Sequence, residues 1–426
     1  MSKMQELKKG LFGDADVRQF GIVLALVAII ALFFVTTDGK VLSSQNLINV
    51  VSQYAYILIL SIGMVLVIIA GHIDLSVGSI AAFVGICVAK LMDGGDGLAW
   101  PLAFAAGIGI GILIGIWQGF WVAKILVPAF IVTLSGMLIW RGADQVIGKS
   151  STIPVPEEFK KIGAGYVPQI GPTYILPGGT KIVNNTTLIL GGLAVLALVI
   201  LELRRRAKTK EVGGEVGPAW GMWVKLVLMG LVIMFFSFKF ATGNPGTGFP
   251  ISGVIMLVLV VIYSFIMNNT VFGRHVYAVG GNKRAAALSG VKVDRVTWIV
   301  MANMSMLAGL AGMIYVARAG ASGPQDGLNW ELDAISAVFI GGAAVTGGVG
   351  TVFGSIIGGL VMAFLNNGLS LMGVGAAQVS IIKGLVLLAA VAFDLLSKQQ
   401  GRKSIIGSIT GGRKKKEKER EAAIAK

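Results

Sequence analysis

The sequence is poor in the residues that build disulfides, metal centres and soluble surfaces. Its 426 residues include one cysteine, Cys87, and two histidines, and only 13% are Asp, Glu, Lys or Arg. A single cysteine excludes an intramolecular disulfide. His72 and His275 are far apart in the sequence and have no cysteine beside them, so we expect no metal site. With 55% hydrophobic residues, the composition excludes a soluble globule and indicates an integral membrane protein.

A nucleotide-binding signature is missing as well. The sequence contains no G-x-x-x-x-G-K-[ST] run, and Gly280-Gly281-Asn282-Lys283 has too few glycines and no core strand before it. We therefore expect no catalytic residue and no cofactor bound by this chain. We also expect no nucleic-acid partner, because the apolar chain leaves no soluble domain large enough for a nucleic-acid fold.

Apolar stretches of span length recur along the whole chain, and together they predict an all-α, polytopic membrane helix bundle of about twelve spans. The predicted spans are 20–36, 53–70, 76–92, 101–122, 130–147, 187–203, 222–238, 251–267, 296–316, 332–346, 349–366 and 379–396. The segment 332–346 is short for a bilayer, which predicts a tilted helix, a broken helix or one buried within the bundle.

The distribution of basic residues predicts the orientation of the bundle. With the N-terminus inside, most of the 36 Lys and Arg residues fall in inner segments, as the positive-inside rule requires. The even number of spans then places both termini in the cytoplasm. Positive-inside anchoring also accounts for the net charge of +15. The basic tail, 398–426, is expected to be a cytoplasmic segment that lies near anionic membrane lipid.

Glycines at four-residue spacing predict tight contacts between helices, because they let two backbones approach closely. They are Gly107, Gly111, Gly115 and Gly119 in one span, and Gly354 and Gly358 in another. A weak internal echo accompanies them: Ser76-Val77-Gly78-Ser79 and Gly348-Val349-Gly350-Thr351 each open a small-residue-rich span. Either two related halves face a shared pathway, or similar Gly, Ala and Val composition has arisen independently.

The segment 148–250 is predicted to be separable from the rest of the bundle. It begins with a polar outer loop, 148–187, which is followed by two spans. Removing it leaves ten spans without changing the orientation of the others. We therefore expect a transmembrane domain over 1–397 with a ten-helix core, to which this outer loop and helix pair are added.

The segment 268–295 is predicted to lie in the cytoplasm and to dock another protein. The segment contains six basic residues and a single acid, Asp294. A short helix is expected from Asn282 to Leu288, with a stop at Gly290. The basic residues are Arg274, His275, Lys283, Arg284, Lys292 and Arg295. A basic helix that projects from a membrane protein is suited to a docking contact.

Polar residues in or beside the spans are candidates for a translocation path. Asp74 lies between two spans, where an ionisable group is costly and usually functional. It could line or gate the path, or it could serve with Ser76 and Ser79 as a helix cap. The other candidates are Asn303, Asn366, Asn367, Ser370 and Gln378, for which hydrogen bonds between helices are the alternative role. The acids near span ends, Asp74, Asp333 and Asp394, have no evident partner in the sequence.

Five segments, in order along the chain, resemble the permeases of monosaccharide ABC importers. They are 63–79 (GMVLVIIAGHIDLSVGS), 128–141 (PAFIVTLSGMLIWR), 277–295 (YAVGGNKRAAALSGVKVDR), 332–350 and 365–394. The extra helix pair and the lead at 36–47 are similar to the xylose-type or multiple-monosaccharide branch of the ribose, xylose and arabinose permease family.

The resemblance implies a bacterial inner-membrane subunit that translocates a monosaccharide, such as xylose or several sugars, inward. It implies a cytoplasmic ATPase subunit that uses ATP and Mg²⁺, an extracytoplasmic sugar-binding protein and a second permease copy in a homodimer. The residues that match the ATPase-coupling helix are Gly281, Asn282, Arg284, Ala285, Ala286 and Gly290. The family pattern has Glu where this chain has Arg284, which leaves the charge of the partner cleft open.

Two other functions are compatible with the sequence. A secondary transporter would work without ATP and would place paired ionisable residues at mid-membrane. A permease of the same architecture could carry another solute, such as a nucleoside, a branched-chain amino acid or a signalling molecule. The first alternative has no need of the docking helix at 282–288.

Overall fold

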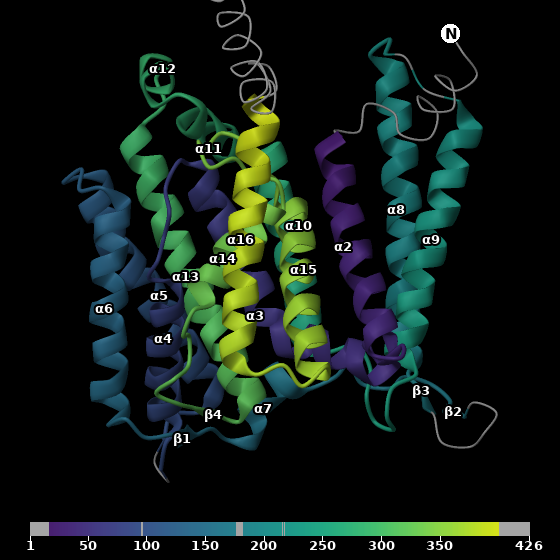
Figure 1. Ribbon diagram of the computed structural model, residues 1–426, viewed down its shortest axis with the longest axis horizontal. Coiled ribbons are helices and arrows are strands. Elements are labelled where there is room, and N and C mark those ends of the chain that lie inside the picture. The colour runs from purple at the N-terminus through teal and green to yellow at the C-terminus, as the bar shows by residue number, and fades with distance from the viewer. Residues whose placement is uncertain (1–16, 95–96, 176–181, 215, 217, 400–426) are drawn as a thin grey trace, which may run out of the picture.

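The computed structural model describes residues 17–94, 97–175, 182–214, 216 and 218–399. The predicted tail beyond residue 399 and the side chain of Asp394 lie outside the described part of the chain. In the described part, long helices run roughly side by side (Figure 1).

The helices, in chain order, are α2 (Val17–Thr36), η1 (Lys40–Leu42), α3 (Ser44–Ile69), α4 (Val77–Met92), α5 (Trp100–Ala123), α6 (Ala129–Gly148), α7 (Glu157–Ala164), α8 (Asn185–Glu211), α9 (Ala219–Ala241), α10 (Ile251–Asn269), α11 (Val271–Gly281), α12 (Lys283–Leu288), α13 (Val293–Ala319), α14 (Trp330–Ile340), α15 (Val352–Leu371) and α16 (Ala376–Gln399). Two-residue strands form two antiparallel pairs: β1 (Ile153–Pro154) with β4 (Ala321–Ser322), and β2 (Tyr174–Ile175) with β3 (Ile182–Val183).

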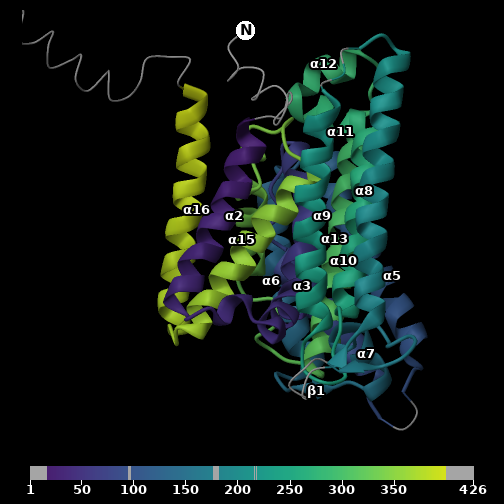
Figure 2. The ribbon, with the colours of Figure 1, turned by 90° about the vertical axis from the view of Figure 1, so that its right-hand side faces the viewer.

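The apolar lengths of these helices confirm the predicted polytopic bundle. Among the described residues, seven helices are long and apolar enough to cross a membrane, and shorter apolar helices cover 21–36, 77–92 and 376–392. The bundle has two distinct ends (Figures 1 and 2). The α12 end holds α11 and α12, together with the start of α2 and the end of α16. The strand end holds β1 and α7.

The short predicted span at 332–346 is an interrupted helix. α14 has 11 residues, which give a length of about 16 Å against about 30 Å of hydrocarbon. An irregular segment, 341–351, follows before α15 begins. Within the interruption, Ala343 and Ala344 are buried in the bundle, whereas Val345 and Val349 are exposed.

The predicted glycine contacts are confirmed where α5 packs against α13. A Cβ at Gly115 would lie 2.5 Å from the Cα of Ala302, and one at Gly111 would lie 2.9 Å from the carbonyl oxygen of Ser305. Both neighbours are main-chain atoms of α13, which cannot turn aside as a side chain can. Gly358 of α15 makes a similar backbone contact with Ala337 of α14. The spacing therefore sets which helix faces touch.

Gly115→Ala is expected to lower the folded fraction of the purified protein, because its methyl group would meet the backbone of α13. Overpacking of this kind costs roughly 1–3 kcal/mol. Gly109→Ala is the matched control, because Gly109 lies on the same helix with nothing within 4 Å of an added Cβ. Thermal unfolding followed by fluorescence-detected size exclusion compares the two variants. Equal midpoints would show that the α5–α13 contact does not limit stability.

The segment 148–250, predicted to be separable, differs along its length in how it packs against the bundle. α7 packs against α13, where Phe159 is fully buried, and β1 pairs with β4 just after α13. The stretch from 149 to 165 therefore belongs to the packed bundle. α8 and α9 pack mainly against each other and stand at one edge (Figures 1 and 2). A peripheral addition, as the structure has it, consists of this helix pair and its adjoining loops.

Candidate functional site

The docking segment folds as two consecutive short helices, α11 and α12, at one end of the bundle. The Asn282 side chain separates them, since its Oδ1 accepts a hydrogen bond from the Ala285 N–H at 3.0 Å and so caps α12. Gly290 adopts a φ of 84°, a left-handed conformation that glycine takes without strain and that ends the helical run. The predicted helix and its glycine stop are both confirmed.

Two of the apolar residues near the end of α12 have opposite environments. Ala286 is only 5% exposed and packs within its own chain, whereas Leu288 is 90% exposed. The sequence prediction grouped Ala286 with the partner-facing residues, and the structure places it in the seat of the helix instead. The sequence prediction named the basic residues of this segment as contacts and did not include Leu288, an apolar residue within a polar run. Lys283, Arg284 and Ala285 are exposed, as are Gly281, Asn282 and Gly290.

α11 is seated on main-chain atoms of two distant segments. A Cβ at Gly280 would overlap the carbonyl oxygen of Ile69, the last residue of α3. The same oxygen accepts a hydrogen bond from the Gly348 N–H at 2.8 Å. The Tyr277 hydroxyl donates to the carbonyl oxygen of Gly350 at 2.8 Å. We call this meeting of Gly280, Ile69 and Gly348 the glycine junction.

The glycine junction joins α12 to the interrupted part of the bundle. Gly348 lies in the irregular segment that links α14 to α15, and Ile69 ends the buried helix α3. His72 lies on the turn after α3, where burial and, to a smaller extent, the charge of Lys283 lower the pKa of its imidazole to about 4. This imidazole is therefore neutral near pH 7. Gly280 of α11 thus contacts the end of α3 and the segment before α15 through main-chain atoms.

Asp74 forms a local turn and does not cap the helix that follows. Its Oδ1 accepts hydrogen bonds from the Ser76 N–H at 2.8 Å and from the Ser76 hydroxyl at 2.6 Å. The predicted caps, Ser76 and Ser79, are wrong: Ser76 at the N-cap makes no side-chain capping bond, and the buried Ser79 hydroxyl has no partner in the described structure. An aspartate that bonds the N–H two residues on competes with serine capping.

Ser76 also links three helices at this point. Its hydroxyl lies 2.9 Å from the amide nitrogen of Gln118, which donates to it from α5. A Cβ at Gly136 of α6 would overlap that same amide group, so a larger residue there would displace the end of the Gln118 side chain. Asp74 is fully buried, and its Oδ2 has no hydrogen-bond partner in the described structure. The segment therefore holds α4, α5 and α6 together around a buried carboxylate.

The remaining path candidates do not gather at one place. Asn303 of α13 bonds the Tyr263 hydroxyl of α10, and Asn367 of α15 exchanges amide hydrogen bonds of 2.8 and 3.0 Å with Asn46 of α3. These are bonds between helices, the alternative role considered for them. Asn366 is half-buried, whereas Ser370 and Gln378 are exposed. The predicted path is therefore not a single cluster of side chains within this chain.

A buried ion pair was missed by the sequence prediction, which left Asp333 without a partner. Lys383 of α16 places its Nζ 2.6 Å from Oδ1 of Asp333 in α14. The Asp333 side chain is 4% exposed and the Lys383 side chain 20% exposed. The two residues are fifty positions apart, so no local pattern could signal their contact. The pair fastens α16 to the interrupted helix.

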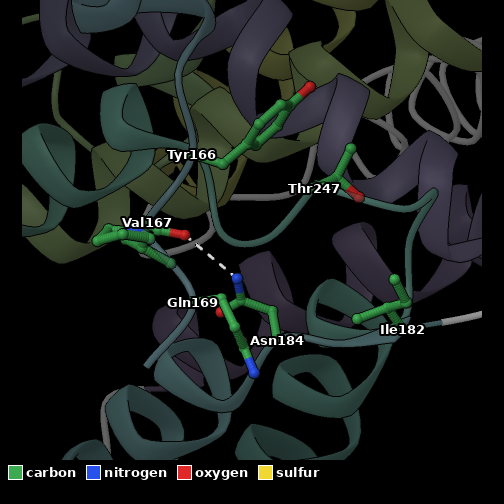
Figure 3. Close-up of a pocket in the computed structure, with 8 residues that line it drawn as sticks. Tyr166, Val167, Gln169, Ile182, Asn184 and Thr247 are labelled. Carbon is green, nitrogen blue, oxygen red and sulfur yellow. Dashed lines mark hydrogen bonds between the residues drawn. The ribbon is translucent and has the colours of Figure 1, made fainter. Parts of the chain in front are cut away.

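A small pocket of about 170 Å³ opens at the strand end, between residues 166–169 and the start of α8 (Figure 3). Asn184 crosses it and donates to the carbonyl oxygen of Val167 at 3.2 Å (Figure 3). Its Oδ1 accepts from the Thr187 N–H at 2.9 Å. The Gln169 amide is likewise bonded to Asn185. These polar groups are already engaged, so they shape the loop and leave little to bind a solute.

Comparison with known proteins places this architecture in a family. Residues 46–391 match the family described as the permease component of the branched-chain amino acid transport system. The chain is 38% identical to the xylose transport system permease protein XylH of Haemophilus influenzae over 388 residues, which cover 91% of this chain and 98% of the relative. The corresponding XylH of Escherichia coli K12 is 36% identical over 90% of this chain and 93% of its own length.

The ribose import permease protein RbsC of Escherichia coli K12 is 32% identical over 372 residues, 87% of this chain and 92% of the relative. No solved structure gives a significant match. The family match spans nearly all of the membrane helices described above. It includes all three residues of the glycine junction. The chain therefore belongs to this family of transport-system permease components, and it is a multi-pass membrane permease, not an enzyme.

Proposed function

We propose that this permease is the membrane-spanning subunit of an ATP-driven importer of a monosaccharide, with xylose as the first candidate. Support comes from the relatives named for xylose transport, which are 36–38% identical along most of the chain, against 32% for the relative named for ribose import. The observation that carries the proposal is α12, an exposed helix whose seat reaches the interrupted core. Such an element suits a permease that receives its energy from another subunit.

In this proposal the exposed surface of α12 contacts a cytoplasmic ATPase subunit, where ATP and Mg²⁺ are used. Gly281, Asn282, Arg284 and Ala285 present the contact, Gly290 ends it, and Ala286 holds the helix in its seat. Arg284 gives this surface a positive charge, so the partner cleft should carry a complementary acid. The α12 end then faces the cytoplasm of a bacterial inner membrane, and both termini lie on that side.

The strand end faces outward, where an extracytoplasmic sugar-binding protein would deliver the substrate. The described polar candidates mostly bond one another between helices, so a complete path needs surfaces from a second permease copy. We therefore propose a homodimer, because two identical chains supply two docking helices for two ATPase domains. Asp74, Ser76 and the asparagines would bound this path, and the binding protein would supply most of the selectivity.

The test is uptake into proteoliposomes that hold the permease together with a cognate ATPase subunit and a cognate sugar-binding protein. Labelled xylose, ribose and leucine form three arms, with leucine included because of the family description. We expect ATP-dependent xylose uptake that survives a proton ionophore. Uptake without ATP that the ionophore abolishes would indicate a secondary transporter. Leucine uptake in place of sugar would overturn the proposed substrate class, and native mass spectrometry would count the permease copies.

Asp74→Asn is expected to retain most of the uptake, because asparagine offers the Ser76 N–H the same acceptor oxygen. Asp74→Leu removes that acceptor and leaves the buried N–H unpaired, at a cost of roughly 1–3 kcal/mol. It should lower the yield of folded permease. Uptake and co-purification of the ATPase are measured together. Loss of uptake by Asp74→Asn with an intact assembly would place the carboxylate in the transport step itself.

A further inference from the structure

A pocket of about 440 Å³ opens at the α12 end, between the starts of α11 and α13. Its lining includes Phe272, His275, Lys292, Arg295, Val296 and Ile299. The larger volume and the basic lining distinguish it from the pocket at the strand end. Gly290, which ends α12, lines it too, and the proposed coupling function uses none of the other lining residues.

The two cations of this pocket are free to meet an anion. Lys292 and Arg295 are both exposed, and in the described structure neither side chain forms an ion pair or a hydrogen bond. The nearest acid in the sequence, Asp294, is already paired with Lys124. His275 adds an imidazole N–H from α11. The pocket is therefore lined by two cationic side chains at the start of α13 and one imidazole from α11.

The pocket also has an apolar side. Ile299 lies one helical turn beyond Arg295 on the same face of α13, and it is 51% exposed. Phe272 is half-buried at the start of α11. α13 is one of the helices long and apolar enough to cross a membrane, and its first turn carries the cations. Cations at the end of a membrane helix with exposed apolar residues beneath them match the boundary between lipid headgroups and acyl chains.

We propose that this pocket binds the headgroup of an anionic phospholipid, with the phosphate held by Arg295 and Lys292. Arginine and lysine form charge-assisted hydrogen bonds to phosphate oxygens, and basic pockets between membrane helices favour anionic headgroups. The acyl chains would lie along Ile299. The exposed part of α12, with Leu288 at its end, remains available to a protein partner. The proposal therefore does not rest on the proposed transport function.

Native mass spectrometry of the purified full-length permease tests the proposal. The protein is exchanged into detergent that contains equal amounts of phosphatidylglycerol and phosphatidylcholine, and the retained lipids are counted. We expect wild-type protein to retain phosphatidylglycerol preferentially. Lys292→Gln with Arg295→Gln should lower its retention about tenfold or more, since each basic residue near a membrane contributes about fivefold.

The matched control is Arg274→Gln with Lys283→Gln, which removes the same charge from neighbouring exposed residues that do not line the pocket. This control should retain phosphatidylglycerol like the wild type. Equal losses in both double variants would reduce the effect to general surface charge and overturn the site. Displacement of the lipid by millimolar glycerol 3-phosphate would assign the pocket to a soluble phosphate. Unchanged phosphatidylglycerol retention by Lys292→Gln with Arg295→Gln would overturn the proposed site.

Discussion

Leu288→Asp is expected to lower ATP-driven uptake at least tenfold while the permease still inserts and folds. The side chain is 90% exposed at the end of α12, so its replacement disturbs no packing within the chain. In a docked complex the same position becomes an apolar contact, where a buried charge costs a few kcal/mol and weakens association. Uptake in membrane vesicles and co-purification of the ATPase are the two measurements.

Val212→Asp is the control for this prediction. Val212 is 75% exposed and ends α8, one of the two edge helices, at the α12 end (Figure 1). The same change of an exposed apolar residue there should leave uptake and ATPase binding near wild-type values. If Leu288→Asp also behaves like the wild type at equal expression, α12 is not the docking helix. If both variants lose uptake, a general effect of negative charge at this face explains the result.

Lys383→Leu is expected to destabilise the permease strongly, because it leaves the carboxylate of Asp333 buried and unpaired. Breaking a buried ion pair by removing one partner costs roughly 3–5 kcal/mol. Asp333 is 4% exposed, so water cannot replace the lost ammonium group. The midpoint of thermal unfolding and the yield of monodisperse protein should both fall, and α16 should be the first helix to become accessible to protease.

The double variant Asp333→Asn with Lys383→Leu should recover much of the lost stability. It removes both charges together, and replacing a whole buried pair by neutral residues is often close to neutral. Recovery separates the loss of the pair from a simple loss of lysine packing. A double variant as unstable as Lys383→Leu would show that the lysine acts through its hydrocarbon stem and not through its charge.

Much of the fold could be predicted because a membrane span requires an apolar run of characteristic length, which is visible in the sequence. The apolar runs place the helices, and the glycine spacing at Gly111 and Gly115 marks the face of α5 that meets α13. The short run at 332–346 left a tilted, a broken or a buried helix open, and the structure shows the break that follows α14. The packing of α7 could not be foreseen, because a polar loop with one buried phenylalanine reads like any outer loop.

The short helix α12 could be located from sequence, whereas the exposure of its individual residues could not. Asn282 and Gly290 bound α12 by local rules of capping and chain reversal, which need no tertiary structure. Which side of a six-residue helix faces its own chain depends on the bundle beneath it. The burial of Ala286 and the exposure of Leu288 therefore could not be predicted, and neither could the pairing of Asp333 with Lys383, because both depend on the assembled helices.

At the glycine junction, main-chain atoms of different segments contact one another with no side chains between them. Side chains that separate two helices can change rotamer and absorb a small shift, but at Gly280 the backbones of three segments meet with no such layer. Packed main chain is nearly incompressible, so a push on one segment must move the others or separate them. Gly281, whose added Cβ would meet nothing within 4 Å, lies beside this junction without sharing its constraint. In the proposed function, a displacement of α11 at this junction would therefore also move the segment that links α14 to α15.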